Sequence, residues 1–213
     1  LSKYFPLQCY SLLLDASDRK LFVHSASWKK LFVLDAETMN LLHIIDKVDA
    51  FRMIRSQHGP FLITWGGSGN ILNFVNTETY QLTTSVDHPV GFLQIRETKS
   101  DPGRWYVATQ GPPRTWVVGI YDHNARTWVR TVTVPVPAEG GWVPDLKVLA
   151  GERKLYAAVW GGHYPGTQCH GFGWLISIDL VTWQARVIPI EGGALSLETV
   201  PDGRQIYVGA ECP

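Results

Sequence analysis

Residues 18–46 read DRKLFVHSASWKKLFVLDAETMNLLHIID, which is three short apolar segments separated by polar turns. Branched and aromatic apolar residues bounded by Asp, Ser and Lys predict β-strands, and the short turns between them predict antiparallel pairing. Residues 11–15 place a further apolar segment ahead of this stretch. The whole region therefore predicts one four-stranded antiparallel sheet whose outer strand covers residues 41–45.

The apolar triplet of the second strand recurs four more times along the chain. The instances are Leu21–Val23, Phe61–Ile63, Trp105–Val107, Leu155–Ala157 and Ile206–Val208. Their last residues are 40, 44, 50 and 51 positions apart. A period of roughly 40 to 50 residues with strand patterning is typical of β-propellers, in which each repeat is a four-stranded blade. We therefore expect an all-β fold of the β-propeller class, with later outer strands at 81–86, 129–134 and 185–190.

The third strand of each full repeat ends in an acidic or amide residue that is followed by a polar turn. These residues are Asp35, Asn76, Asp122 and Asp179. Asp and Asn at the start of a tight turn accept hydrogen bonds from their own backbone two residues further on. The position therefore favours hairpin closure over a catalytic role.

The repeats cover about residues 10–48, 49–88, 89–140 and 141–192, and a partial fifth covers 193–213. We expect one propeller domain or propeller fragment, residues 1–213, with about four full blades. An incomplete blade leaves strand edges unpaired, which favours membership of a larger, seven- or eight-bladed propeller. The alternative is an incomplete five-bladed ring in which residues 1–7 add an outer strand to the last half-blade.

Residues 19–23 and 34–46 carry a family resemblance. The sequence RKLFV, followed by LDAETMNLLHIID, resembles the YVTN-type propeller repeat and is similar to the propeller of amine dehydrogenase large subunits. The resemblance covers most of the chain as architecture, but the motif describes a blade and brings no catalytic residue with it. It implies extracytoplasmic localisation, periplasmic or secreted, because YVTN-like propellers are often exported.

The composition excludes several classes of function. Nineteen basic and nineteen acidic residues give a net charge of zero, and no Lys or Arg cluster runs along the chain. This argues against a surface that follows nucleic-acid phosphates. No apolar run approaches the roughly 20 residues needed to cross a bilayer, so we expect no membrane span. The chain also lacks a Gly-x-Ser-x-Gly elbow, a phosphate loop and a His-Glu-x-x-His motif.

Tryptophan followed by two glycines comes after the second strand in two repeats, at Trp65 and Trp160. This connection belongs to one mouth of a propeller, where loops on a rigid scaffold commonly bind ligands. The candidate ligand-binding residues are His24, Trp65, Gln110, Trp160, His163, Tyr164 and Glu211. The alternative is that the mouth tryptophans only pack between blades. Packing is the expected role of the tryptophans in or beside strands, namely Trp105, Trp116, Trp128, Trp174 and Trp183.

The longest insertion, residues 161–173, contains His163, Cys169 and His170. Two imidazoles and a thiol are ligand types that bind zinc or copper, and a fourth ligand would have to come from elsewhere, for example His24 or Glu211. The alternatives are an ordinary Gly-rich surface loop or a partner contact. We expect no cofactor, with zinc or copper in this loop as the competing hypothesis.

The remaining cysteines and histidines give weaker signals. Cys9 and Cys212 would form a disulfide in an oxidising compartment if the termini meet, and otherwise they are partly buried free thiols. Four further histidines fall on an outer strand or on turns, where solvated side chains are expected. They are His43, His58, His88 and His123.

Two classes of function remain open. The first is a noncatalytic binding or assembly module that uses loops on the propeller face to bind a protein or a glycan, or the missing blades of its own propeller. The strong repeat and the absence of catalytic motifs favour it. The second is a propeller subunit of a redox or metal-dependent enzyme with a site at the mouth, which rests on the family resemblance and on the 161–173 loop.

Overall fold

The computed structural model describes residues 9–15, 17–25, 28–66, 70–111, 115–135, 142–149, 151, 153–163, 171–200 and 205–210. Every regular element within these residues is a β-strand, and none is a helix that could cross a membrane. The predicted all-β class is therefore confirmed. The chain divides into two compact units, residues 1–91 and 92–213.

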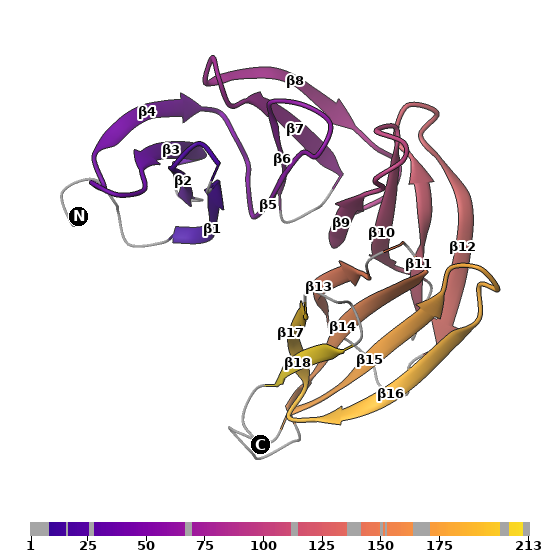
Figure 1. The fold of residues 1–213 in the computed structure, drawn as a ribbon. Helices are drawn as coiled ribbons and strands as arrows, with labels where there is room; N and C mark the ends of the chain where they lie inside the picture. Colours follow the sequence, from indigo (N-terminus) through magenta and orange to yellow (C-terminus); the bar gives the residue numbers. More distant parts are fainter. Residues whose placement is uncertain are drawn as a thin grey trace. The chain divides into compact units, whose positions relative to one another are not determined.

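The first unit contains two four-stranded sheets, which we call blades 1 and 2 (Figure 1). Blade 1 consists of β1 (Cys9–Asp15), β2 (Lys20–Ser25), β3 (Lys30–Asp35) and β4 (Leu41–Asp46). Blade 2 consists of β5 (Arg52–Arg55), β6 (Phe61–Trp65), β7 (Ile71–Asn76) and β8 (Gln81–Asp87). In both blades, strands that are consecutive in sequence pair antiparallel, as the short turns predict.

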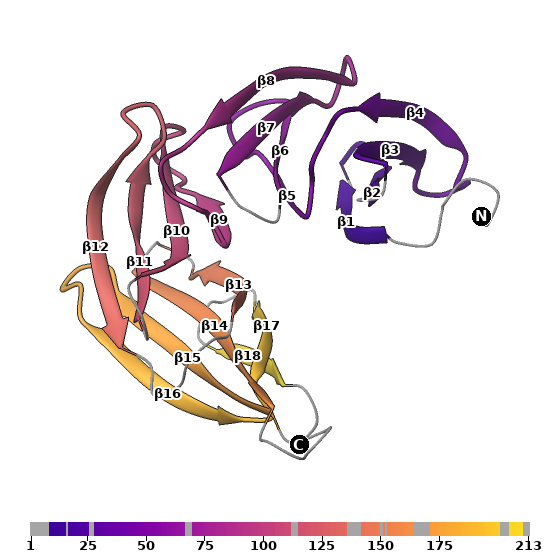
Figure 2. The same cartoon turned by 180° about the vertical axis from the view of Figure 1, so that it is seen from behind.

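The second unit contains blades 3 and 4 and a two-stranded half-blade (Figure 2). Blade 3 consists of β9 (Gln94–Glu97), β10 (Arg104–Gln110), β11 (Thr115–Asp122) and β12 (Thr127–Pro135). Blade 4 consists of β13 (Trp142–Val148), β14 (Lys154–His163), β15 (Gly171–Asp179) and β16 (Ala185–Glu191). The half-blade consists of β17 (Ala194–Thr199) and β18 (Ile206–Ala210). The outer strands β8, β12 and β16 cover the predicted ranges, which confirms four full blades and a partial fifth.

The same turn closes the third and fourth strands in all four blades. The Asp35 carboxylate accepts hydrogen bonds from the backbone N–H groups of Glu37 (3.1 Å) and Thr38 (2.7 Å). Asn76, Asp122 and Asp179 each accept the corresponding pair. The residue four positions after each acceptor has a positive φ, namely Met39, Tyr80, Arg126 and Trp183. The prediction that this position closes a hairpin is confirmed.

This turn also corrects the alignment of blade 2. The residue opposite the turn acceptor is Lys20 in blade 1, Phe61 in blade 2 and Arg104 in blade 3. The triplet that matches the other blades is therefore 62–64, one residue later than the sequence predicted. Thr64 takes the position at which blade 1 has Val23.

Within the first unit, blade 1 packs against blade 2 through one face of each sheet. Phe22 and Val33 of blade 1 share a buried cluster with Leu62 and Val75 of blade 2, and Met53 of β5 packs against that cluster. We call the face that meets the following blade the trailing face, and the face that meets the preceding blade the leading face. Phe22 is thus on a trailing face and Met53 on a leading face.

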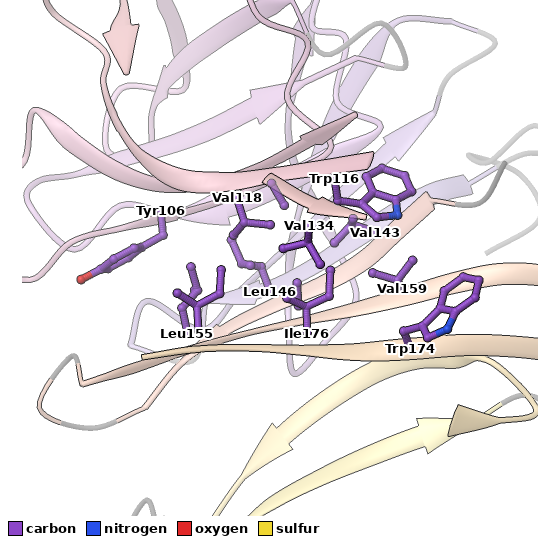
Figure 3. Packing of buried hydrophobic residues seen from close by; sticks show 13 residues of the cluster. Tyr106, Trp116, Val118, Val134, Val143, Leu146, Leu155, Val159, Trp174 and Ile176 are labelled. Carbon is purple, nitrogen blue, oxygen red and sulfur yellow. The ribbon is translucent and has the colours of Figure 1, made fainter. Parts of the chain in front are cut away.

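The second unit repeats this arrangement twice. Tyr106 and Trp116 of blade 3 share a buried cluster with Leu146 and Ile176 of blade 4, and Figure 3 shows these side chains between the two sheets. The trailing face of blade 4 then covers the leading face of the half-blade, in a cluster that contains Leu197. Trp105, Trp116 and Trp174 are buried, which confirms that they are packing residues.

An ion pair joins the first strands of blades 3 and 4. Arg96 of β9 donates from Nη2 to Oδ1 of Asp145 in β13 (2.9 Å). Asp145 also accepts hydrogen bonds from the backbone N–H groups of Leu146 (2.8 Å) and Leu197 (3.0 Å). One carboxylate therefore connects blade 3, blade 4 and the half-blade. A mostly buried pair whose carboxylate accepts three hydrogen bonds is costly to break, because the partner charge stays behind.

Asp145→Ala is expected to lower the free energy of unfolding by about 2–4 kcal/mol, because it leaves Arg96 and two backbone N–H groups without their acceptor. Urea unfolding followed by tryptophan fluorescence measures this loss. Lys147→Ala is the control: Lys147 pairs with the largely exposed Glu198 (3.4 Å), so its loss should cost at most about 0.5 kcal/mol. Equal losses in the two variants would contradict the bridging role of Asp145.

Candidate binding face at one end of the strands

The connections between second and third strands, and those from one blade to the next, lie at the same end of the blades. We call this the mouth end of each unit. His24 and Trp65 occupy matching register positions there, one residue beyond the aligned triplet. Gln110 and Trp160 match each other two residues further along, on the same face of the sheet. The four predicted residues therefore lie at two different positions along the second strand, two residues apart.

In the first unit, His24 holds the connection between blades 1 and 2. Its side chain is fully buried, and Nε2 accepts a hydrogen bond from the backbone N–H of Ala50 (3.2 Å). An acceptor nitrogen is unprotonated, so a neutral ring here carries its proton on Nδ1. Burial lowers the pKa of His24, and the nearby charge of Asp49 only partly offsets this. A ligand would reach this imidazole only after the connection had moved.

The same connection is tied to blade 2 by side-chain hydrogen bonds. The backbone carbonyl of Asp49 accepts from Asn73 Nδ2 (3.0 Å) and from Thr64 Oγ1 (3.1 Å), and Ser85 donates to Asn73 Oδ1 (2.7 Å). Trp65, the residue after Thr64, is buried, and a Cβ at Gly66 would collide with the Asp49 carboxylate. The mouth end of the first unit is thus occupied by its own hydrogen-bonded connection.

In the second unit, aromatic side chains reach the surface at the mouth end. Trp142 of β13 lies directly opposite Trp160 of β14 in the antiparallel ladder, so both side chains project from the same face. Trp142 is 37% exposed and Trp160 is half-buried. We call these two residues the Trp142–Trp160 pair. Sequence analysis found Trp160 but missed Trp142, because a bulge between Trp142 and Asp145 hides the pairing.

Glycines bring the backbone close beneath this pair. Gly193, in the connection from β16 to β17, has a φ of +74°, and a Cβ there would lie 2.7 Å from Cδ1 of Trp160. A Cβ at Gly173 would collide with the carbonyl of Val159 and approach Ala194 N to 2.8 Å. A side chain at either position would displace the indole or the strand. The glycines therefore let Trp160 rest on the backbone while Trp142 faces solvent.

Two exposed or half-exposed indoles on neighbouring strands bring apolar rings with polar N–H groups to the surface. Such surfaces bind aromatic, aliphatic or sugar faces, and they supply no proton donor or acceptor of the strength that acid–base catalysis requires. In the part of the chain that the structure describes, no cluster of three or more His, Cys, Asp or Glu side chains is placed to hold a metal ion.

The other predicted site residues are placed as follows. Gln110 is exposed at the end of β10. His163 is the last residue of β14, but its side chain lies outside the described part, as does the Cys9 side chain in β1. Tyr164, Cys169, His170, Glu211 and Cys212 lie outside the described residues. The metal site, the disulfide and the ligand-binding roles stay predictions.

The expectation that the remaining histidines are solvated is wrong for two of them. His88 is buried, and His123 is half-buried and stacks on Trp105 with ring centroids 4.2 Å apart and an interplanar angle of 6°. Burial lowers the pKa of His123 more than the charges of Asp122, Glu97 and Asp101 raise it. A turn position predicted exposure, but the neighbouring indole covers the ring.

Comparison with solved structures identifies the architecture. The chain matches hydrazine synthase of Kuenenia stuttgartiensis with a TM-score of 0.74 and 13% identity, over 96% of this chain and 62% of that chain. It matches the β-propeller domain of Cps50 (Swd1) of Myceliophteria thermophila with a TM-score of 0.59 and 14% identity, over 95% and 62%. The fold is a β-propeller. A third match is the dihydro-heme d1 dehydrogenase NirN in complex with DHE, with a TM-score of 0.55 and 10% identity, over 86% and 38%.

At 10–14% identity, these structural similarities show the fold alone. The chain spans 62% of the length of each of the first two structures. No protein-family model matches it, and no curated protein matches it significantly. The YVTN resemblance and membership of a larger propeller therefore stay predictions.

The stability of the protein is expected to fall as the pH drops below about 6.5, in part through His24. The folded-state pKa of His24 lies below the unfolded value, so at intermediate pH only the unfolded chain takes up the proton. The contribution of neutral His24 to stability is fully present above the pKa of His24 in the unfolded chain. It is lost as the pH falls from that value toward the lower pKa of His24 in the folded protein. Urea midpoints at pH 7.5 and 5.5 measure the effect.

His24→Gln is the matched variant, since its amide retains an acceptor for Ala50 N–H without titrating. Its urea midpoint should change less between the two pH values than that of the wild type. His123 titrates in both proteins, so the difference isolates His24. An identical pH dependence would contradict a neutral buried His24.

Proposed function

We propose that this β-propeller is a noncatalytic binding module that engages a protein partner through the Trp142–Trp160 pair at the mouth end of its second unit. The observation that carries the proposal is the pairing of a 37% exposed tryptophan with a second indole supported by Gly193. Tryptophan is among the residues most enriched at the energetic centres of protein interfaces. An indole held from beneath loses little rotamer freedom on binding, which favours affinity.

The rest of the second unit supports this proposal by making the surface rigid. Blade 4 is buried on both faces, against blade 3 on one side and the half-blade on the other. Asp145, three residues from Trp142 on the same strand, ties all three sheets together. A recognition surface on such a scaffold keeps its geometry when the partner arrives.

Trp142→Ala and Trp160→Ala are expected to reduce partner capture by at least about tenfold, since each removes a central indole contact. The measurement is affinity capture from native extract with immobilised protein, followed by quantitative mass spectrometry. Trp28→Ala is the matched control: Trp28 is 50% exposed in the first unit, and its loss should leave capture unchanged. Equal capture by wild type and both mouth variants would contradict the proposal.

A glycan partner is the competing ligand, because exposed indoles also bind the faces of sugar rings. A glycan array probed with wild type and Trp142→Ala distinguishes the two. Glycan binding that Trp142→Ala abolishes, without any protein captured, would replace the protein partner by a sugar.

An enzyme subunit is the second candidate function. Two of the matched structures are named as enzymes, hydrazine synthase and a dihydro-heme d1 dehydrogenase, and at 13% and 10% identity they share only the fold with this chain. The remaining support is the hypothesis of a zinc or copper site at His163, Cys169 and His170. Extracytoplasmic localisation likewise stays a proposal that rests on the YVTN resemblance.

Metal analysis separates the two candidates. For the binding module, purified protein is expected to contain far less than one zinc, copper or iron per chain, and chelation should leave its melting temperature unchanged. Cys169→Ser is the matched variant. One equivalent of metal in the wild type that is lost in Cys169→Ser would favour the enzyme subunit instead.

A further inference from the structure

In both units, the outer strand of one blade contacts the turn between the third and fourth strands of the next blade. In the first unit, the imidazole of His43 in β4 stacks on Tyr80 of blade 2, with ring centroids 5.2 Å apart and an interplanar angle of 22°. In the second unit, Cζ of Arg130 in β12 lies 4.9 Å from the centroid of the Trp183 ring in blade 4. Figure 1 shows the turn between β15 and β16 beside β12. We call the end of the strands at which these turns lie the turn end.

The two contacts are equivalent in register. His43 and Arg130 each lie opposite the residue two positions before the turn acceptor of their own blade. Tyr80 and Trp183 are the residues with positive φ four positions after the acceptor of theirs. The second contact joins blades 3 and 4, which pack against each other through a common buried cluster. Its surface therefore does not depend on where the sequence begins or ends.

In the first unit, the positive charge beside the turn is balanced within the chain. Nζ of Lys20 lies 5.2 Å from the centroid of the Tyr80 ring and 3.6 Å from a carboxylate oxygen of Asp18. The neighbouring Arg19 forms an ion pair with Glu37. These cations at the turn end of blade 1 are thus used in ion pairs of their own unit.

The turn end of the second unit carries an excess of positive charge. Arg130 is exposed, and no carboxylate of the described residues forms an ion pair with it. The same is true of three further exposed arginines in or beside the turns of blades 3 and 4, namely Arg126, Arg153 and Arg186. The carboxylates of the corresponding turns, Asp122 and Asp179, each accept two backbone N–H groups. An anionic partner would therefore be attracted to this end.

Trp183 gives Arg130 a fixed orientation. Its indole is half-buried and packs against the cluster between blades 3 and 4, so the ring itself is held in place. A guanidinium that lies over an indole keeps its N–H groups at the edge of its own plane, where they match the two oxygens of a carboxylate. A side chain that is already ordered also loses less conformational freedom when it binds.

Exposed valines lie on both segments of this contact. Val181, in the same turn as Trp183, is 73% exposed, and Val129, the residue before Arg130, is 47% exposed. Val129 is the extra residue of a bulge in β12, and bulges commonly change the direction of a side chain. Apolar side chains beside an arginine suit a peptide in which an apolar residue follows or precedes a carboxylate.

We propose that Arg130, Trp183 and the two valines bind an acidic segment of a protein partner. Arg130 binds an Asp or Glu carboxylate of that segment, and Val129 and Val181 contact an apolar residue next to it. Charge complementarity and the exposed valines favour such a peptide over nucleic acid, whose phosphates offer no apolar group. The Trp142–Trp160 pair lies at the mouth end of the second unit, so this proposal and the proposed function can fail separately.

Selection of short random peptides displayed on phage, with wild type as the immobilised target, tests the site. Peptides that bind Arg130→Gln are removed first. The remaining peptides are expected to carry Asp or Glu next to Leu, Ile, Val or Phe. A labelled peptide of the selected sequence then gives a Kd by fluorescence anisotropy, and its version with Gln or Asn in place of the acid should bind at least about tenfold more weakly.

Variants of the protein separate a specific site from general attraction. Arg130→Lys keeps the charge but loses the planar guanidinium, so the Kd of the selected peptide should rise at least about tenfold. Val181→Asp should weaken binding similarly by repulsion, and the turn is retained because Val181 contributes its backbone N–H to it. Arg19→Gln is the matched control, an exposed arginine of the first unit whose loss should leave the Kd unchanged. Trp142→Ala should also leave it unchanged, and circular dichroism establishes that each variant is folded.

Four outcomes overturn the proposal. The selection may enrich no sequence with an acid beside an apolar residue, or Arg130→Lys may bind the peptide as wild type does. Arg19→Gln may lose as much affinity as Arg130→Lys, which would indicate attraction by net charge alone. Finally, inorganic phosphate or single-stranded DNA may bind as tightly as the peptide and depend on Arg130, which would make this a phosphate site instead.

Discussion

The packing of the trailing face of one blade against the leading face of the next is the interaction on which the rest of the structure depends. A four-stranded sheet has two apolar faces, and each must be covered by another layer. The cluster that contains Phe22 and Leu62 meets this requirement in the first unit, and the cluster that contains Tyr106 and Leu146 meets it in the second. No blade buries both faces alone, so each relies on its neighbours for stability, as repeat architectures do.

The strands and hairpins were predictable from sequence because the forces that form them are local. The Asp35 carboxylate closes its turn with hydrogen bonds to backbone groups two and three residues away. A short stretch of sequence contains all the residues of such a turn, so it can be recognised without knowledge of the rest of the fold. Register was less predictable. Phe61 is apolar at a position where other blades have Lys or Arg, and Thr64 is polar where others are apolar, so an alignment on hydrophobicity shifts by one residue. The reason for Thr64 is its hydrogen bond to the Asp49 carbonyl, a contact 15 residues away.

The candidate site was predictable only in part, for a related reason. His24 and Gln110 follow the aligned triplets of their strands at similar places in the sequence, yet the first is fully buried and the second is exposed. The difference depends on the connection between blades, which covers His24 through Ala50, and on a shift of two residues along the strand. Trp142 precedes the aligned triplet of its blade by 13 residues, and the pairing with Trp160 passes through a bulge. Neither relation leaves a periodic signal in the sequence.

The two units show two ways of holding the chain as it passes from one blade to the next, and the difference explains why binding is proposed for only one of them. In the first unit, Thr64 and Asn73 stand where blade 1 has apolar residues, and both donate hydrogen bonds to the backbone carbonyl of Asp49. Polar side chains therefore hold the connection between blades 1 and 2 in place. In the second unit, Gly193 lets the backbone pass directly beneath Trp160, where any other side chain would displace the indole. Glycine has no side chain, so the backbone can lie against the indole of Trp160. The first connection is therefore held by side-chain hydrogen bonds, whereas the second approaches Trp160 closely at Gly193, on the strand next to a Trp142 that is 37% exposed.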